Sequence, residues 1–168
     1  MTLSMYQASV PVFLSMLENL SNILSRAEAD ATERRIDPNI FLTARLAPDM
    51  FALARQVQIA TDHAKGAPSR LAGREVPRYE DTEATFGELQ ARIEKTRNYL
   101  KTFEQKDIDG SEDRVIEIKG GGRLFSFSGA QYLLHYALPN FYFHVTTAYD
   151  ILRHNGVDLH KRDFIGGS

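Results

Sequence analysis

The sequence contains no cysteine and no long hydrophobic run. Without cysteine there can be no disulfide, no thiolate metal ligand and no cysteine nucleophile, and this absence is in keeping with a reducing compartment. No apolar stretch approaches the roughly 20 residues that cross a bilayer. The N-terminal stretch MTLSMYQASVPVFLSML lacks the basic segment and the small-residue cleavage site of a signal peptide. We therefore expect a cytoplasmic protein with no membrane partner.

An excess of charge of either sign is also missing. The formal net charge is -2, and acidic and basic residues are interspersed along the chain. Nothing in this balance attracts the protein to nucleic acid. The sequence shows no repeat, no low-complexity tract and no linker, and its 168 residues are close to the commonest size of one domain. We therefore expect residues 1–168 to form a single domain without a nucleic-acid partner.

Several catalytic signatures are absent as well. There is no nucleophile elbow, no phosphate-binding loop and no H-E-x-x-H pair. The three glycines at 120–122 lie between two β-rich stretches rather than before a helix, which argues against a phosphate-binding role. The acidic residues of 107–113 do not have the spacing of an EF-hand, so we interpret them as solvated charge. The motifs therefore indicate no reaction class.

The hydrophobic pattern predicts an all-α fold with four long helices. From about Ser4 to Ala29, apolar residues recur in steps of three and four, which is the helical period. A second helix is predicted to begin at Pro48, because proline suits a first helical position, and to end near Gly66 or Pro68. The Asp-Pro-Asn sequence at 37–39, between these helices, is typical of a turn.

The boundaries of the last two long helices have clearer signals. Thr85 and Glu88 match a capping box at the start of the third helix, and Ser128 and Gln131 match one at the start of the fourth. The fourth helix is predicted to end just before Gly156, which can adopt the left-handed conformation of a C-terminal cap.

A β-hairpin is predicted between these two helices. The stretches 114–119 and 123–128 are short and β-rich, and glycines separate them. A lone hairpin is only marginally stable, so we expect this one to pack on the helices. The sequence thus predicts a four-helix bundle with a small β-hairpin before the last helix.

The last helix carries the candidate site. Asn140 and His144 lie about 40° apart within its apolar stripe, and polar side chains on a core-facing surface need partners. His135 faces about 180° away and cannot belong to the same site. Pro139 removes one backbone hydrogen bond, and we expect the carbonyl of His135 to be freed. The resulting kink either makes room for a ligand or only bends the helix around the core.

Two segments of the chain resemble a known family. Residues 131–156, QYLLHYALPNFYFHVTTAYDILRHNG, resemble the last helix of a bacterial family of unknown function within the DinB/YfiT-like superfamily, and the L-P-N-F-Y-F-H motif is typical of that subgroup. Residues 55–66, RQVQIATDHAKG, resemble the second helix of the same family. The resemblance extends over nearly the whole chain. It implies a DinB/YfiT-like four-helix bundle that is often a homodimer.

The same resemblance implies a divalent metal such as zinc or nickel, held by three histidines. One of these comes from the second helix and two come from an H-x-x-x-H pair on the last helix. In this sequence the pair reads Asn140-x-x-x-His144. An amide oxygen is a poorer zinc ligand than an imidazole and carries no charge. We therefore expect a degenerate metal site, with His63 and His144 as its metal ligands.

The second helix supplies the expected partners of this site. His63 is the first choice, and Gln56, seven residues earlier on the same flank, is the second. Asp62 is expected to point toward solvent. The predicted ligand-binding residues are therefore His144, Asn140, His63 and Gln56.

Three hypotheses about function remain open at this point. The first is a bundle protein that binds a small molecule or a metal at a degenerate metal site. The second is a metal-dependent enzyme of the thiol transferase or hydrolase type, in which a metal-activated water or thiolate is the nucleophile. The third is a non-catalytic structural or interaction protein whose polar core residues only hydrogen-bond one another. The sequence names no substrate.

Overall fold

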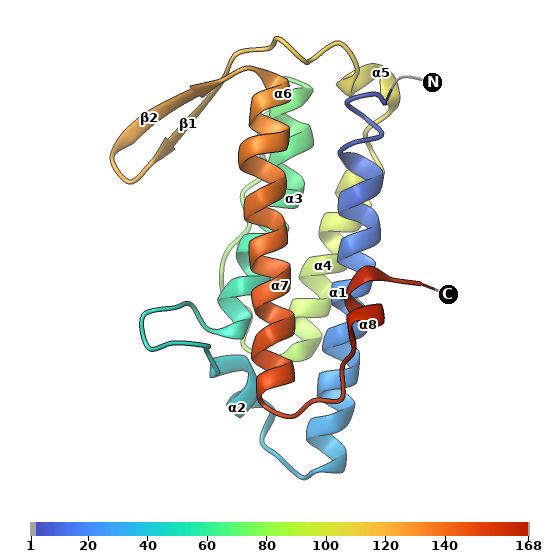
Figure 1. The fold of residues 1–168 in the computed structure, drawn as a ribbon, viewed down its shortest axis with the longest axis vertical. Coiled ribbons are helices and arrows are strands. Elements are labelled where there is room, and N and C mark those ends of the chain that lie inside the picture. Colours follow the sequence, from blue (N-terminus) through green and yellow to red (C-terminus); the bar gives the residue numbers. More distant parts are fainter. Residues whose placement is uncertain (1–2, 168) are drawn as a thin grey trace.

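The computed structural model describes residues 3–167 and has the expected mainly helical architecture (Figure 1). Four long helices, α1, α3, α4 and α7, run side by side along its length. A two-stranded hairpin projects from one end, and the short helix α8 packs against α1. The elements are α1 Val10–Glu33, α2 Pro38–Thr43, α3 Leu53–Leu71, α4 Phe86–Leu100, α5 Gln105–Ile108, β1 Ile116–Gly120, β2 Arg123–Phe127, α6 Gly129–Tyr132, the π-helical turn η1 Leu133–Ala137, α7 Leu138–His154 and α8 Lys161–Ile165.

The hydrophobic core lies between the four long helices, and each presents a buried apolar stripe to it. Phe13 of α1 meets Phe141 of α7 edge to face, with ring centroids 4.9 Å apart. Small residues on α3, among them Ala60 and Ala64, are fully buried and face the other helices. Helix α3 has more extensive contacts with α7 than with any other helix. This pair of helices carries every residue of the predicted site.

The capping signals are confirmed. The Thr85 hydroxyl accepts from the Glu88 amide at 3.1 Å, and the Glu88 carboxylate accepts from the Thr85 amide at 3.0 Å. Ser128 and Gln131 exchange the same two bonds at the start of α6. Gly156 has φ 89°, so it ends α7 in the left-handed region as expected.

The boundaries of the first two long helices were predicted less well. Helix α1 begins at Val10 and continues to Glu33, and α3 begins at Leu53 rather than at Pro48. The Asp-Pro-Asn sequence at 37–39 begins the short helix α2, because the Asp37 side chain accepts from the amide two residues later at 3.0 Å. Pro68 lies inside α3, which ends only at Leu71, where burial of the last turn offsets the lost hydrogen bond.

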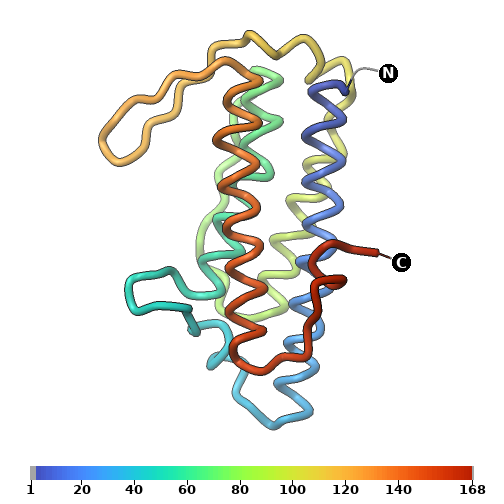
Figure 2. Tube along the Cα trace, in the orientation of Figure 1, coloured from blue at the N-terminus to red at the C-terminus, as the bar shows by residue number. Residues whose placement is uncertain are grey.

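The hairpin is confirmed and packs on the bundle. Strands β1 and β2 pair in antiparallel register, with Ile118 opposite Phe125. Ile116 and Ile118 are buried. Phe127 at the end of β2 contacts the rings of Tyr132 and Tyr136, at centroid distances of 6.4 and 5.4 Å. The hairpin is therefore anchored beside the first turns of the last helical segment, which runs without interruption from α6 to α7 (Figure 2).

Among the described residues, no helix combines the length and the apolar character that a membrane crossing requires.

Gly129 allows the backbone before the hairpin to approach the start of α6. A β-carbon at this position would overlap the carbonyl oxygen of Ser111, which is a backbone atom and cannot turn aside. We predict that Gly129→Ala lowers the free energy of unfolding by about 1–3 kcal/mol, the usual cost of overpacking. Urea denaturation followed by circular dichroism measures the difference.

Gly87→Ala is the matched control, because Gly87 also lies in the first turn of a helix. The nearest atom to a β-carbon there is the Thr85 hydroxyl oxygen at 3.9 Å, so alanine fits. Its higher helix propensity should leave α4 unchanged or stabilise it by up to about 1 kcal/mol. Equal effects of the two substitutions would contradict the close approach at Gly129.

Candidate functional site

His144 on α7 is held by a hydrogen bond to Gln56 on α3. Its Nδ1 lies 2.7 Å from Oε1 of Gln56, and both side chains are buried. The Gln56 amide nitrogen donates to the carbonyl oxygen of Phe51 at 3.0 Å, so its oxygen faces the histidine as an acceptor. His144 Nδ1 must therefore carry the proton. In a neutral ring this leaves Nε2 with its lone pair free to bind a proton donor or a metal.

His63 lies next to His144, as the sequence predicted. The two imidazole rings are nearly parallel, with an interplanar angle of 14° and centroids 5.9 Å apart. His63 also meets the ring of Tyr136 edge to face at 6.1 Å, and His144 meets that of Phe143 at 5.2 Å. Helices α3 and α7 thus bring together a pair of imidazoles within an aromatic surrounding.

Both imidazoles are neutral near pH 7. Burial, together with a smaller effect of the neighbouring His144, lowers the pKa of His63 from its usual 6.5 to about 4. Burial likewise lowers the pKa of His144 to about 4, with a smaller contribution from the positive charge of Arg55. Neutral imidazole is the form that accepts hydrogen bonds and ligates metals.

Asn140 does not join this pair. Its side-chain amide nitrogen donates to the carbonyl oxygen of Tyr136, one turn back on the same helix, at 2.7 Å. The preceding backbone forms a π-helical turn, in which the amide of Leu138 bonds to the carbonyl of Leu133 five residues earlier. The expectation that Pro139 leaves the carbonyl of His135 without its helical hydrogen bond stays a prediction. The bond from the Asn140 side chain goes to the next carbonyl, that of Tyr136.

The donor set does not fit a three-histidine metal centre. Within residues 3–167, no three side chains of His, Cys, Asp or Glu lie close enough to hold one metal ion. The site presents two imidazole nitrogens, those of His63 and His144, and the nearby amide of Asn140 is turned to its own helix. Zinc sites in proteins use three or four side-chain ligands. The departure at Asn140 therefore removes the third strong ligand without a replacement.

A small pocket of about 120 Å³ adjoins His63 on the side of the hairpin. Arg70 of α3 lies in its wall and donates to the hydroxyl oxygen of Tyr132 at 3.1 Å. Ile118 of β1 lies in the wall as well, so the hairpin covers part of the pocket. The lining residues are Asp62, His63, Arg70, Ile118, Tyr132 and Tyr136. This pocket gives a ligand access to His63, whose ring lies next to that of His144.

Asp62 does not point freely into solvent, in contrast to the expectation from the sequence. Its carboxylate accepts from Arg92 at 2.9 Å and from Lys65 at 2.5 Å. The Arg92 side chain, only 2% exposed, reaches from α4 and also bonds to the carboxylates of Asp81 and Glu83, at 3.1 and 3.0 Å. The helical count had placed Asp62 toward solvent, and its side chain is 37% exposed, but the count took no account of a buried arginine that arrives from the next helix.

The sequence did contain a signal for this network. Arg92 falls three residues after Leu89 and one before Ile93, within the apolar stripe of α4. A charged residue at such a position is buried only when it is paired, so it predicts carboxylate partners.

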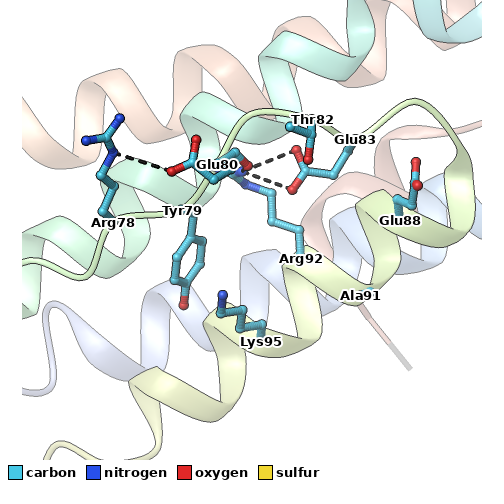
Figure 3. A pocket seen from close by; sticks show the side chains of 9 residues that line it. All are labelled: Arg78, Tyr79, Glu80, Thr82, Glu83, Glu88, Ala91, Arg92 and Lys95. Carbon is cyan, nitrogen blue, oxygen red and sulfur yellow. Dashed lines mark hydrogen bonds and ion pairs between the residues drawn. The ribbon is translucent and has the colours of Figure 1, made fainter.

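A larger pocket of about 420 Å³ lies on the outer side of this network (Figure 3). The ring of Tyr79 forms one wall, and three cations lie near it: the Lys95 nitrogen at 4.1 Å, the Lys65 nitrogen at 4.8 Å and the Arg92 guanidinium at 5.4 Å from its centroid. Figure 3 shows Arg92 reaching across the pocket to Glu83. The pocket combines acidic and basic groups without an excess that selects one ligand class.

Comparisons with known proteins agree with this architecture. The family described as "Domain of unknown function (DUF1993)" matches residues 5–165. The chain is also similar to a DinB family member protein from Shewanella denitrificans, whose crystal structure aligns with a TM-score of 0.88 and 40% sequence identity. That alignment covers 97% of this chain and 92% of the other. The search of curated proteins gave no match.

We predict that Arg92 is among the most important polar residues for stability. Arg92→Leu would leave Asp62, Asp81 and Glu83 without their shared cation, and breaking a buried ion pair of this kind costs about 3–5 kcal/mol. The free energy of unfolding, measured by urea denaturation, should fall by that amount.

Arg97→Leu on the same helix is the control. Arg97 contacts two exposed carboxylates, those of Glu18 and Glu94, and exposed pairs contribute at most about 1 kcal/mol. A loss at Arg92 no larger than the loss at Arg97 would show that the buried network does not hold the helices together.

Proposed function

The chain belongs to the DUF1993 family and has a DinB-like fold, and from this premise we propose that it is a binding protein for a small molecule or a metal ion. The site is the pair His63 and His144 together with the pocket beside it. Gln56 orients His144, and Asn140 stands where the related metal sites have a histidine. The site is thus a degenerate metal site that is used for binding. We propose no reaction for it.

The observation that carries the proposal is the hydrogen bond from His144 to Gln56. It fixes the tautomer, so Nε2 of a buried and neutral ring is left as a directed acceptor. A histidine that only filled the core would also need a partner for Nδ1, but among residues 3–167 no group forms a hydrogen bond with Nε2. The parallel ring of His63 adds a second neutral acceptor at the same place. Two aligned acceptors beside a pocket suit a ligand with hydrogen-bond donors.

A small molecule fits this arrangement better than a metal ion does. Two imidazoles are one strong ligand short of the usual protein set for zinc. A divalent ion remains the second candidate, because an Nε2 lone pair that is oriented by a second residue is also what metal sites use. In that case His63 and His144 would hold zinc or nickel, and water would have to complete the coordination. The predicted homodimer also remains part of the proposal.

The proposal can be tested with protein labelled with ¹⁵N in its five histidines. The sample is titrated at pH 7 with zinc, with nickel, and with small probes that carry a thiol, an amine or a carboxylate. We expect at least one probe to shift the ring signals of His63 and His144 together. The exposed His135, on the opposite side of the helix, should not respond and serves as an internal control.

His144→Ala should abolish the response of His63 to the same probe. Stoichiometric binding of zinc or nickel that disappears in this variant would favour the metal over the small molecule. If none of the probes moves either ring, the imidazole pair does not bind small ligands and the two histidines are structural.

A further inference from the structure

Arg70 has a charge that no carboxylate neutralises. It projects from the last turn of α3 into the pocket beside His63, where it is half-buried. Its guanidinium donates to the neutral hydroxyl of Tyr132 at 3.1 Å and lies 5.9 Å from the centroid of that ring. It makes no salt bridge with any residue of the described chain, 3–167. A guanidinium in such a place normally has an anionic partner.

The nearby carboxylates are already matched by other cations. Asp62, which lines the same pocket, accepts from Lys65 and Arg92. The network around it contains three carboxylates and three cations, linked by ion pairs of 2.5–3.1 Å. Its members are Asp62, Asp81, Glu83, Lys65, Arg92 and Arg55. The charge of Arg70 is therefore in excess at this end of the pocket.

Gly66, one turn before Arg70, leaves room for the guanidinium to lie along the helix. A β-carbon at position 66 would overlap Nη1 of Arg70. Gly66 has no positive φ, so the glycine is not required by the backbone. The absence of a side chain at position 66 and the hydrogen bond that Arg70 donates to the Tyr132 hydroxyl together hold the arginine in one orientation.

The remaining walls of the pocket suit a small group. The stacked rings of Tyr132 and Tyr136, 5.9 Å apart, and Ile118 of the hairpin exclude part of the solvent, which strengthens the attraction between opposite charges. The volume of about 120 Å³ is well below the roughly 300–1,000 Å³ of sites for drug-sized ligands. It can hold a single anionic group, either alone or as the end of a longer molecule.

We propose that this pocket binds an oxyanion, a carboxylate or a phosphate group, through the guanidinium of Arg70 and the hydroxyl of Tyr132. The planar fork of arginine matches both groups. The hairpin β1–β2 covers the bound anion, with Ile118 as the contact. This inference rests on the proposed function, because it gives the ligand class for the same site, and His63 forms the wall that the anion and the imidazole pair share.

The test is a titration followed by ¹H–¹⁵N correlation spectra, at pH 7 in a buffer free of other oxyanions. The probes are propionate, inorganic phosphate and propionamide, which is a neutral isostere of propionate. We expect saturable binding of at least one of the two anions and none of propionamide. Arg70→Gln should weaken anion binding at least about tenfold, because a charge-assisted hydrogen bond is lost. Binding of only one anion would identify the group.

Two further variants separate this role from a structural one. Gly66→Ala should weaken binding by displacing the guanidinium, while the midpoint of thermal unfolding stays unchanged or rises, because alanine favours the helix. Arg153→Gln removes an exposed arginine near the end of α7 and should bind like the wild type. The proposal is overturned if the wild type binds neither anion, or if Arg70→Gln and Gly66→Ala bind as tightly as the wild type.

A failure of the anion proposal can be told apart from a failure of the proposed function. If zinc, nickel or a thiol moves the rings of His63 and His144 but neither oxyanion binds, only the anion proposal fails. If an oxyanion binds in an Arg70-dependent manner and no probe moves either ring, the imidazole pair is not part of the site.

Discussion

The buried guanidinium of Arg92 holds the helices and the loop beside the candidate site together. It reaches from α4 to the side of α3 and to the loop between them, and its partners are three carboxylates and the Thr61 hydroxyl, 2.7 Å away. A charge so deeply buried is tolerated only when its partners surround it, so this guanidinium links α3, α4 and the loop. Asp62 is one of those partners, and His63 is the next residue. The position of the imidazole pair therefore depends on an ion network on the other flank of the helix.

The same ion network explains why Asp62 and Arg70, two charged residues of α3 that line one pocket, differ in how strongly they attract a ligand. Asp62 is neutralised by Lys65 and Arg92 and so contributes little attraction to the pocket that it lines. Arg70 shares that pocket, but among residues 3–167 its one hydrogen-bond partner is the Tyr132 phenol, so its positive charge is available to a ligand. Gln56 acts in a similar way on His144, since its Oε1 accepts a hydrogen bond from Nδ1–H and leaves Nε2 free. The neighbouring side chains thus determine which groups of the candidate site keep a charge or a lone pair for a ligand.

Features set by a few adjacent residues could be predicted from the sequence. The capping boxes at Thr85 and Ser128, the hairpin and the Gly156 cap depend on local backbone chemistry and were predicted correctly. The proximity of His63, Gln56 and His144 also followed from helical spacing together with the family resemblance.

Features that depend on the neighbouring helix could not be predicted in this way. Asp62 was assigned to solvent because the helical count does not show an arginine arriving from α4. The side chain of Asn140 bonds to the Tyr136 carbonyl of its own helix, beside a π-helical turn, and periodicity reveals neither feature. Arg70 was not singled out, since its isolation becomes visible only when the partners of every nearby charge are known.

The candidate site depends on His144 being a neutral ring with its proton on Nδ1 and its Nε2 free. Long-range ¹H–¹⁵N spectra of ligand-free, histidine-labelled protein report the tautomer and the charge of each ring directly. We predict the Nδ1–H tautomer for His144 at pH 7, persisting as the pH falls until it approaches the lowered pKa of about 4. An Nε2–H tautomer at pH 7, or an imidazolium already formed above pH 6, would contradict the account.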